Sequence, residues 1–279
     1  MVFLEFNMLD LSILIVHYNT PGLLRQTLKG IRSSAPVLNY EVIVIDNNAR
    51  MRVEEMIKNE FPDVKVVVSE KNLGFGKGMN LAMKKAKGRH VFIGNPDICL
   101  FPGVFEKLVA FLDEHKDVGM VGPQLLNPDG TVQDSCYRFM KPEVIMYRRV
   151  PFIGKLSSAK KVVDDYLMKE VDHNKTMDVD YLLGAAILIR AEALEQVGVF
   201  DPEYFMYFED QDLCRRFWKA GWRVVYHPDA KLVHYHRRET AQGGFLSQLT
   251  NPLTRIQIKS ALYYYKKYKG DINPRTQEV

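Results

Sequence analysis

The sequence is short of cysteine, of net charge and of long apolar runs, and each shortage argues against a class of protein. Its three cysteines are odd in number and widely spaced, so we expect neither a disulfide framework nor a zinc cluster. Free thiols fit a reducing compartment. A net charge of +4 is too small for the concentrated basic face of a duplex-DNA binder, so we expect no nucleic-acid partner.

A membrane span is not expected either, because no segment reaches the ~20 apolar residues that one needs. The N-terminal stretch MVFLEFNML lacks a basic region, and Glu5 interrupts its apolar residues, so we expect no secretory signal. These features predict a cytoplasmic protein. Hydrophobic residues make up 47% of the 279 residues, which is enough for a substantial globular core.

Short apolar runs alternate with helical stretches in the first half of the chain. Four runs are typical of buried parallel strands, at 11–16, 41–45, 64–68 and 90–93. This alternation predicts an α/β fold, with a parallel sheet and helices on both faces. Ligands of such sheets bind at the carboxyl ends of the strands. The polar residues expected at three of those ends are His17, Tyr18 and Asn19, then Asp46, then Asp97.

The second half is less regular. Residues 139–175 lack clear periodicity and predict a variable loop or short helices. Further elements are expected as strands at 184–190 and 224–226, and as helices at 210–220 and 254–269.

The segment Asn95-Pro96-Asp97 follows an apolar strand, so its carboxylate is expected at the edge of the sheet. Mg²⁺ binds through one or two carboxylates together with substrate phosphates, and Asp97 fits that task. An Asn-Pro-Asp segment is also a common turn, and taken alone the turn is the better interpretation.

The stretch Asn72 to Asn80 carries three glycines in five residues, between an expected strand and an expected helix. Such a loop lets backbone approach a ligand and points N–H groups at an anion. Its spacing matches neither the dinucleotide fingerprint nor the P-loop. The alternative is a connection that uses glycine for its geometry alone.

Two clusters of titratable residues lie further along. Glu209, Asp210 and Asp212 open an expected helix, where acids serve as caps but can also act as a general base. His234 and His236 lie two apart on an extended segment, so their rings share a face and can supply a metal ligand. A structural role for these histidines is the commoner outcome.

The order of these segments resembles the family 2 glycosyltransferases, and most of all their rhamnosyltransferase-like branch. The resemblance covers residues 11–236 through LSILIVHYN, EVIVIDNN, NLGFGKGMN, FIGNPD and the block from Gly184 to His236. It implies a GT-A fold with a mostly parallel central sheet flanked by helices. It also implies a nucleotide-binding half at 10–123 and an acceptor and catalytic half at 124–250. Together these form one domain over 1–250, followed by a helical tail at 251–279.

The same resemblance implies roles for individual residues. Asn95-Pro96-Asp97 corresponds to the metal-binding D-x-D motif, with Asn95 in place of its first acid. His234 or His236 corresponds to a metal ligand, and we favour His234, together with Asp97. Asp210 corresponds to the base of inverting members. The residues implied to contact the nucleotide are His17, Tyr18, Asn19, Asp46, Asn72, Gly74, Asn95 and Asp97.

The implied reaction is an inverting transfer of a sugar, with rhamnose as one candidate, from a UDP or dTDP donor to a saccharide or lipid-linked acceptor. Asp210 would deprotonate the acceptor hydroxyl, with Glu209 beside it, and a divalent Mg or Mn ion would neutralise the leaving diphosphate. Gly184 and Ala185 are small and would leave room for the acceptor. Arg237 or Arg238 would clamp a phosphate.

Other functions compete with this one. A sugar nucleotidyltransferase would carry a basic glycine-rich loop after the first strand. This chain has no Lys or Arg in that segment until Arg25. A non-catalytic nucleotide-sugar-binding homologue would not need the acids at 209 and 210. The tail mixes lysine with tyrosine, which predicts either peripheral contact with the inner face of a membrane or a helix that covers the core.

Overall fold

The structure is a computed structural model that describes residues 9–34, 37–48, 50–149, 156–235 and 251–276. Its strands are β1 (Leu11–His17), β2 (Tyr40–Asp46), β3 (Lys65–Val68), β4 (His90–Gly94), β5 (Ile98–Leu100), β6 (Val118–Leu126), β7 (Cys136–Tyr137), β8 (Met177–Asp178), β9 (Tyr181–Leu182), β10 (Ala186–Arg190) and β11 (Arg223–His234). Its helices are α1 (Pro21–Ser34), α2 (Glu54–Glu60), α3 (Gly74–Met83), α4 (Val104–Glu114), α5 (Pro142–Arg149), α6 (Ser157–Tyr166), α7 (Ala191–Val197), α8 (Glu209–Lys219), α10 (Pro252–Lys267) and the 3-10 helix η3 (Pro274–Thr276).

The central sheet has the strand order β3-β2-β1-β4-β10-β6-β11-β5 within the described part of the chain, with β8 added beside β11. Strands β3, β2, β1 and β4 are parallel, and so are β6 and β11. Strand β10 runs antiparallel between β4 and β6. The predicted α/β sheet is confirmed, but the strand expected at 184–190 begins at Ala186 and runs against its neighbours.

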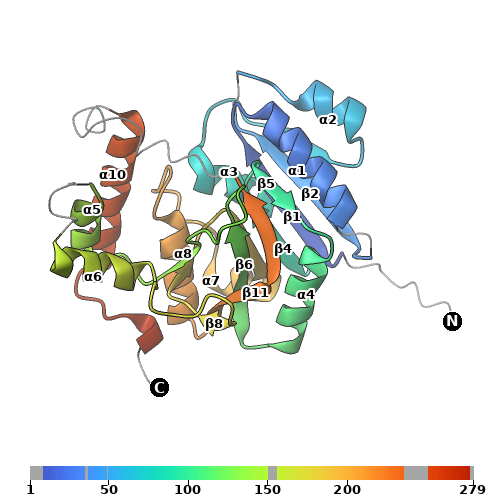
Figure 1. The fold of residues 1–279 in the computed structure, drawn as a ribbon. Helices are drawn as coiled ribbons and strands as arrows, with labels where there is room; N and C mark the ends of the chain where they lie inside the picture. Colours follow the sequence, from blue (N-terminus) through green and yellow to red (C-terminus); the bar gives the residue numbers. More distant parts are fainter. Residues whose placement is uncertain (1–8, 35–36, 49, 150–155, 236–250, 277–279) are drawn as a thin grey trace.

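Helices cover both faces of this sheet, as predicted (Figure 1). On one face, α1, α2 and α4 contribute buried side chains such as Leu28, Ile57 and Leu108. On the other face, α3 and α8 contribute Met79 and Phe217. A strand with both faces covered has no solvated side, which explains why its apolar residues run on without alternation.

The glycine-rich segment is helix rather than loop, which corrects the sequence prediction. Helix α3 begins at Gly74 and includes all three glycines. A Cβ atom added at Gly76 would lie 3.3 Å from Phe200, and one at Gly78 would lie 3.2 Å from Val16. The glycines therefore let α3 pack closely against the sheet and against the chain before α8.

Residues 139–175 contain two short helices, α5 and α6, as one of the two alternatives predicted. The tail forms α10, which stands beside α5 at one end of the molecule (Figure 1). It packs Ala261 and Tyr264 against Tyr204 and Phe208, so it does cover part of the core. No helix within the described ranges is long and apolar enough to cross a membrane.

Candidate active site

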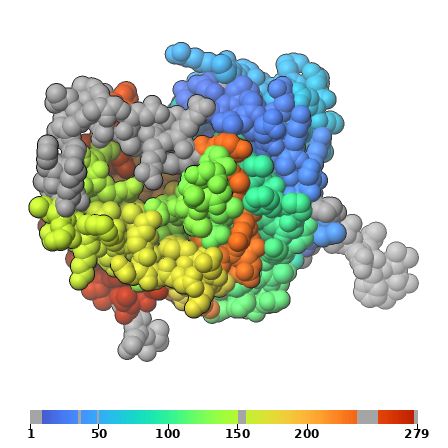
Figure 2. Space-filling model, viewed as in Figure 1, coloured from blue at the N-terminus to red at the C-terminus, as the bar shows by residue number. Residues whose placement is uncertain are grey.

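Several polar residues meet at one edge of the sheet. Strands β1, β2 and β4 end there at His17, Asp46 and Gly94, because they are parallel and in register. Strand β11 ends at His234, which pairs with Ile98 of β5. The last residues of β11 reach the surface in the middle of the space-filling view, between green segments and blue α1 (Figure 2). The antiparallel β10 begins at the same edge, which brings Gly184 and Ala185 beside these ends.

Asp97 and His234, predicted as metal ligands, lie next to each other. The His234 Nε2 atom lies 3.4 Å from Asp97 Oδ1 and 3.4 Å from the Asn95 side-chain nitrogen. The Tyr235 amide also donates to the Asp97 carbonyl at 2.9 Å, so the two segments are tied by backbone as well. The competing candidate His236 and the two arginines at 237 and 238 lie outside the described residues.

Gln133 orients the imidazole, and the sequence analysis missed it. Its Oε1 lies 2.7 Å from His234 Nδ1, and its Nε2 donates to Asn127 Oδ1 at 3.0 Å, which fixes the amide orientation. Nδ1–H of His234 therefore donates to Gln133, and Nε2 is presented toward Asp97. A histidine whose second nitrogen is held by a hydrogen bond is the usual arrangement of a metal ligand.

The pair fits a hard divalent cation. Asp97 Oδ1 is buried and accepts no hydrogen bond among the described residues, although it faces His234. A buried carboxylate oxygen without a donor is unfavourable unless a cation can use it. No cluster of three or more His, Cys, Asp or Glu suited to a metal is found in the part of the chain that the structure describes. Two protein ligands completed by substrate phosphates are what Mg²⁺ commonly uses.

Thr27 of α1 holds the turn that carries Asp97. Its hydroxyl lies 2.9 Å from the carbonyl of Pro96 and 2.8 Å from that of Ile98, and the side chain is fully buried. Asn95-Pro96-Asp97 is therefore both a turn and a presented carboxylate, so the two alternatives for this motif do not exclude each other.

Asp210 lies in the first turn of α8 and faces the start of β10. Its Oδ2 accepts the Gly184 amide at 3.1 Å, and its Oδ1 accepts the Gln211 amide at 2.8 Å. Burial raises the pKa of Asp210, and these two backbone hydrogen bonds oppose the rise because they favour the carboxylate.

Glu209 differs from its neighbour. It is buried, and its Oε2 has no hydrogen-bond partner among the described residues. Burial, and then the charge of Asp210, raise the pKa of Glu209 well above its ordinary value. Burial thus disfavours the charged form of both acids, while the Gly184 and Gln211 amides favour the carboxylate of Asp210.

A line of contacts connects Asp210 to the Asp97–His234 pair. Gly184 donates to Asp210, and the carbonyl of the next residue, Ala185, accepts the Asn95 amide at 2.9 Å. Asn95 in turn contacts His234. The small residues also allow this approach, since a Cβ at Gly184 would lie 3.4 Å from the Asp210 Cβ. The predicted base and the predicted metal ligands are therefore linked by successive contacts at this end of the sheet.

The predicted nucleotide residues lie further along the edge. His17 and Asp46 are fully buried, with His17 Nδ1 3.6 Å from Asp46 Oδ1. Burial lowers the pKa of His17, and its Nε2 accepts the Thr20 amide at 3.0 Å. Tyr18 is exposed, and Asn19 has a left-handed backbone with φ 56° and accepts the Arg50 amide at 2.8 Å.

Asn47 organises the entry to α3 and was also missed. Its side chain donates to Asn72 Oδ1 and to the Gly74 carbonyl, and it accepts the Leu73 amide at 2.9 Å. Gly74 has φ 76°, and a Cβ there would lie 2.0 Å from the carbonyl oxygen of Phe205. Only glycine fits this position. It allows the segment that precedes α8 to pack directly against the start of α3.

The fold matches solved glycosyltransferases. A structure of GalNAc-T7 with UDP, GalNAc and Mn²⁺ aligns with a TM-score of 0.63 at 16% identity, over 97% of this chain and 52% of that one. The mannosyltransferase PcManGT of Pyrobaculum calidifontis, solved with GDP-Man and Mn²⁺, aligns with a TM-score of 0.58 at 15% identity, over 96% of this chain and 78% of that one. These alignments show a GT-A fold.

The sequence assigns the family. Residues 10–255 match the glycosyltransferase-like family 2, so the chain belongs to that family and is a glycosyltransferase. It is 28% identical to an N-acetylglucosaminyl-diphospho-decaprenol L-rhamnosyltransferase of Mycobacterium tuberculosis, over 72% of this chain and 68% of that enzyme. It is 24% identical to the rhamnosyltransferase WbbL of Escherichia coli, over 80% of this chain and 82% of that enzyme.

Proposed function

We propose that this glycosyltransferase moves a sugar, with inversion, from a nucleoside-diphosphate sugar to an acceptor hydroxyl, and that Asp210 is its base. The acceptor oxygen forms a bond to the anomeric carbon while the bond from that carbon to the diphosphate breaks. Asp210 takes the hydroxyl proton, and the departing nucleoside diphosphate keeps the bonding electron pair.

The contrast between Asp210 and Glu209 carries the assignment. Two backbone amides stabilise the Asp210 carboxylate, whereas the Glu209 Oε2 atom is buried without a donor. A base must be ionised before it accepts a proton, so the stabilised carboxylate is the better candidate. Asp210 also contacts Gly184, and we place the acceptor beside Gly184 and Ala185.

Asp97 and His234 would hold a divalent cation, Mg²⁺ or Mn²⁺. When bound, that ion supplies positive charge beside the diphosphate of the donor. Support comes from the buried Asp97 Oδ1 and from the Gln133 contact that turns His234 Nε2 toward it. The donor nucleotide would lie along the sheet edge from this pair to Asp46 and Asn72, with Tyr18, Asn19 and Gly74 around it.

UDP and dTDP sugars are the donors that we propose, and rhamnose is the first sugar to test. The names of the mycobacterial and Escherichia coli relatives state rhamnosyl transfer for those proteins, and the mycobacterial name states a lipid-linked acceptor. For this chain we propose a saccharide or lipid-linked acceptor of cell-surface glycan synthesis, used at the cytoplasmic side of a membrane.

A stability screen tests the donor class. Thermal melts with UDP, dTDP, GDP and ADP, each with and without Mn²⁺, should single out one base in the presence of the metal. Saturation at about 100 times Kd adds about 2.7 kcal/mol to the free energy of unfolding. No stabilisation by any diphosphate at millimolar concentration would overturn the proposal.

We also propose that the exposed face of α10 meets anionic lipid. Residues 251–270 contain no acid. The exposed side chains of the helix repeat at helical spacing and combine basic with apolar groups, at Arg255, Ile258, Lys259, Leu262 and Lys266. Lys269 is also exposed, in the turn that follows the helix. Such a face suits a headgroup layer, because cations attract anionic lipids while apolar side chains enter the interface.

Vesicle sedimentation tests this contact. The protein should pellet with vesicles that contain phosphatidylglycerol and much less with phosphatidylcholine alone. Reversal of charge at Lys259, Lys266 and Lys269 together should abolish the difference. Equal pelleting with both vesicle types, or no effect of the triple change, would rule the contact out.

A further inference from the structure

The turn that precedes Asp210, the proposed base, has an unfavourable backbone. Tyr207 and Phe208 have φ of 69° and 68°, and both are non-glycine residues in the left-handed region. They directly precede Glu209 and Asp210 at the start of α8. A backbone of this kind persists only where the surrounding structure holds it in place.

Helix α10 contacts this turn directly. The Ser260 hydroxyl donates to the Met206 carbonyl at 2.8 Å. The Phe208 ring packs against Tyr264 and Tyr265 of α10, with ring centroids 5.4 and 6.0 Å apart. Phe208 is buried in this cluster, so α10 packs directly against the turn.

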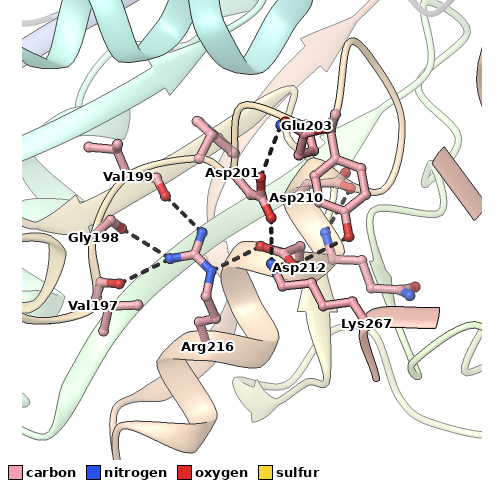
Figure 3. A network of polar contacts seen from close by, with 12 residues as sticks. Val197, Gly198, Val199, Asp201, Glu203, Asp210, Asp212, Arg216 and Lys267 are labelled. Carbon is pink, nitrogen blue, oxygen red and sulfur yellow. Dashed lines mark hydrogen bonds and ion pairs between the residues drawn. The ribbon is translucent and has the colours of Figure 1, made fainter. Parts of the chain in front are cut away.

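Lys267 of α10 joins both sides of the turn through two carboxylates. Its Nζ lies 2.6 Å from Asp212 Oδ1 and 2.6 Å from Asp201 Oδ2. Asp212 is fully buried in α8, two residues beyond Asp210, while Asp201 precedes the turn. Figure 3 shows Lys267 between these two acids, with Arg216 on the far side of Asp212.

Arg216 completes the network from within α8. Its Nε lies 2.9 Å from Asp212 Oδ2, and its guanidinium donates to the carbonyls of Val197, Gly198 and Val199 (Figure 3). Asp212 therefore has a cation on each oxygen, one from α8 and one from α10. A buried carboxylate paired in this way resists rearrangement, since loss of either cation leaves a charge poorly compensated.

We infer that α10 is a positioning element for catalysis and that Lys267 is its main positioning residue. Lys267 pairs with Asp201 and Asp212, at the two ends of the segment 201–212. These two ion pairs stabilise the strained turn, and the turn places the Asp210 carboxylate against Gly184. The inference rests on the proposed role of Asp210 as base. The lysine-rich tail thus serves the active site from its inner face, in addition to the contact proposed for its outer face.

The test compares Lys267→Met with Lys65→Met. Lys65 also pairs at 2.6 Å with a buried acid, Glu41, but at the amino end of β3 and away from the site. Hydrogen–deuterium exchange should accelerate at residues 203–210 in Lys267→Met and stay unchanged there in Lys65→Met. This readout does not require activity, so it tests the positioning claim even if the proposed chemistry fails.

Kinetics then link the turn to catalysis. We expect Lys267→Met to lower kcat at least tenfold while the Kd for nucleoside diphosphate stays within about twofold, and Lys267→Arg to restore most of kcat. Ser260→Ala, which removes one hydrogen bond, should give a smaller change of the same kind. Unchanged exchange at 203–210 in Lys267→Met would overturn the inference. So would equal losses of kcat in Lys267→Met and Lys65→Met.

Discussion

Replacement of Asp210 by asparagine separates catalysis from helix capping. Asparagine keeps one oxygen, which can still accept the Gly184 amide, but its NH₂ group would face the Gln211 amide now held at 2.8 Å. One buried donor left without an acceptor costs about 1–3 kcal/mol. Loss of a buried charge offsets part of this cost. We therefore expect a small change in the free energy of unfolding.

The kinetic effect should be much larger. Removal of a general base lowers kcat by about 10²–10⁴-fold, or about 2.7–5.4 kcal/mol in activation free energy at 1.36 kcal/mol per tenfold. Nucleotide affinity should be nearly unchanged, because Asp210 contacts the start of β10 rather than the residues predicted to hold the donor. The assay is kcat at saturating donor and acceptor, with calorimetry for nucleoside diphosphate.

Glu209→Gln is the matched control. Burial raises the pKa of Glu209 well above its ordinary value and so favours its neutral form, which glutamine resembles. We therefore expect kcat of Glu209→Gln to remain within a few-fold of wild type. An Asp210→Asn enzyme with nearly full activity would refute the assignment. A large loss in Glu209→Gln alone would transfer the role to Glu209.

Three further outcomes follow from the contacts described above. Gln133→Ala should weaken Mn²⁺ affinity about 10–100-fold, because it removes the acceptor that orients His234, and unchanged affinity in a Mn²⁺ titration would contradict this. Gly74→Ala should lower the free energy of unfolding by about 2–4 kcal/mol, because the new Cβ would overlap the Phe205 carbonyl and the residue has a left-handed backbone. An unaltered denaturant midpoint would disprove the close approach of these two segments. Burial raises the pKa of Glu209 in the folded protein. Above about pH 4.3 the unfolded chain releases this proton more readily than the folded protein does. The free energy of unfolding therefore falls as pH rises above that value. Glu209→Gln should remove that loss and raise the melting temperature at neutral pH, whereas a lower melting temperature would show that the carboxylate is needed.

The main features of the fold could be predicted from the sequence, because they rest on local patterns. Apolar runs that end in polar residues placed Asp46 and Asp97 at one sheet edge, and the structure confirms that edge. The direction of β10 could not be predicted in this way. An apolar run looks the same whether the strand is parallel or antiparallel to its neighbours. The direction of β10 depends instead on the path of the long connection between β6 and β10.

The supporting residues of the site escaped prediction for a related reason. Gln133 and Thr27 lie far from their partners in the sequence, and each is an ordinary polar residue without a motif. The glycines at 74–78 were misassigned because glycine usually disfavours helix. Here close packing against Val16 and Phe200 outweighs that preference.

The tail shows how composition alone leaves two outcomes open. Lysine and tyrosine suit both a membrane surface and a packed helix, and the sequence pattern favoured neither. The structure buries Tyr264 and places the Lys267 ammonium on Asp212, while Leu262 and Lys266 are exposed. One helix can therefore meet the core on one face while a second contact remains available on the other.

We propose that Asp97 and His234 hold a metal against the donor diphosphate, and calorimetric titration with UDP and dTDP tests this proposal. Wild-type protein should bind one of these nucleotides in Mn²⁺ and bind it at least tenfold more weakly in EDTA. Asp97→Ala should bind weakly in both conditions, without rescue by excess Mn²⁺. Equal affinity in Mn²⁺ and EDTA, or an Asp97→Ala protein that binds like wild type, would show that Asp97 and His234 hold no metal against the diphosphate.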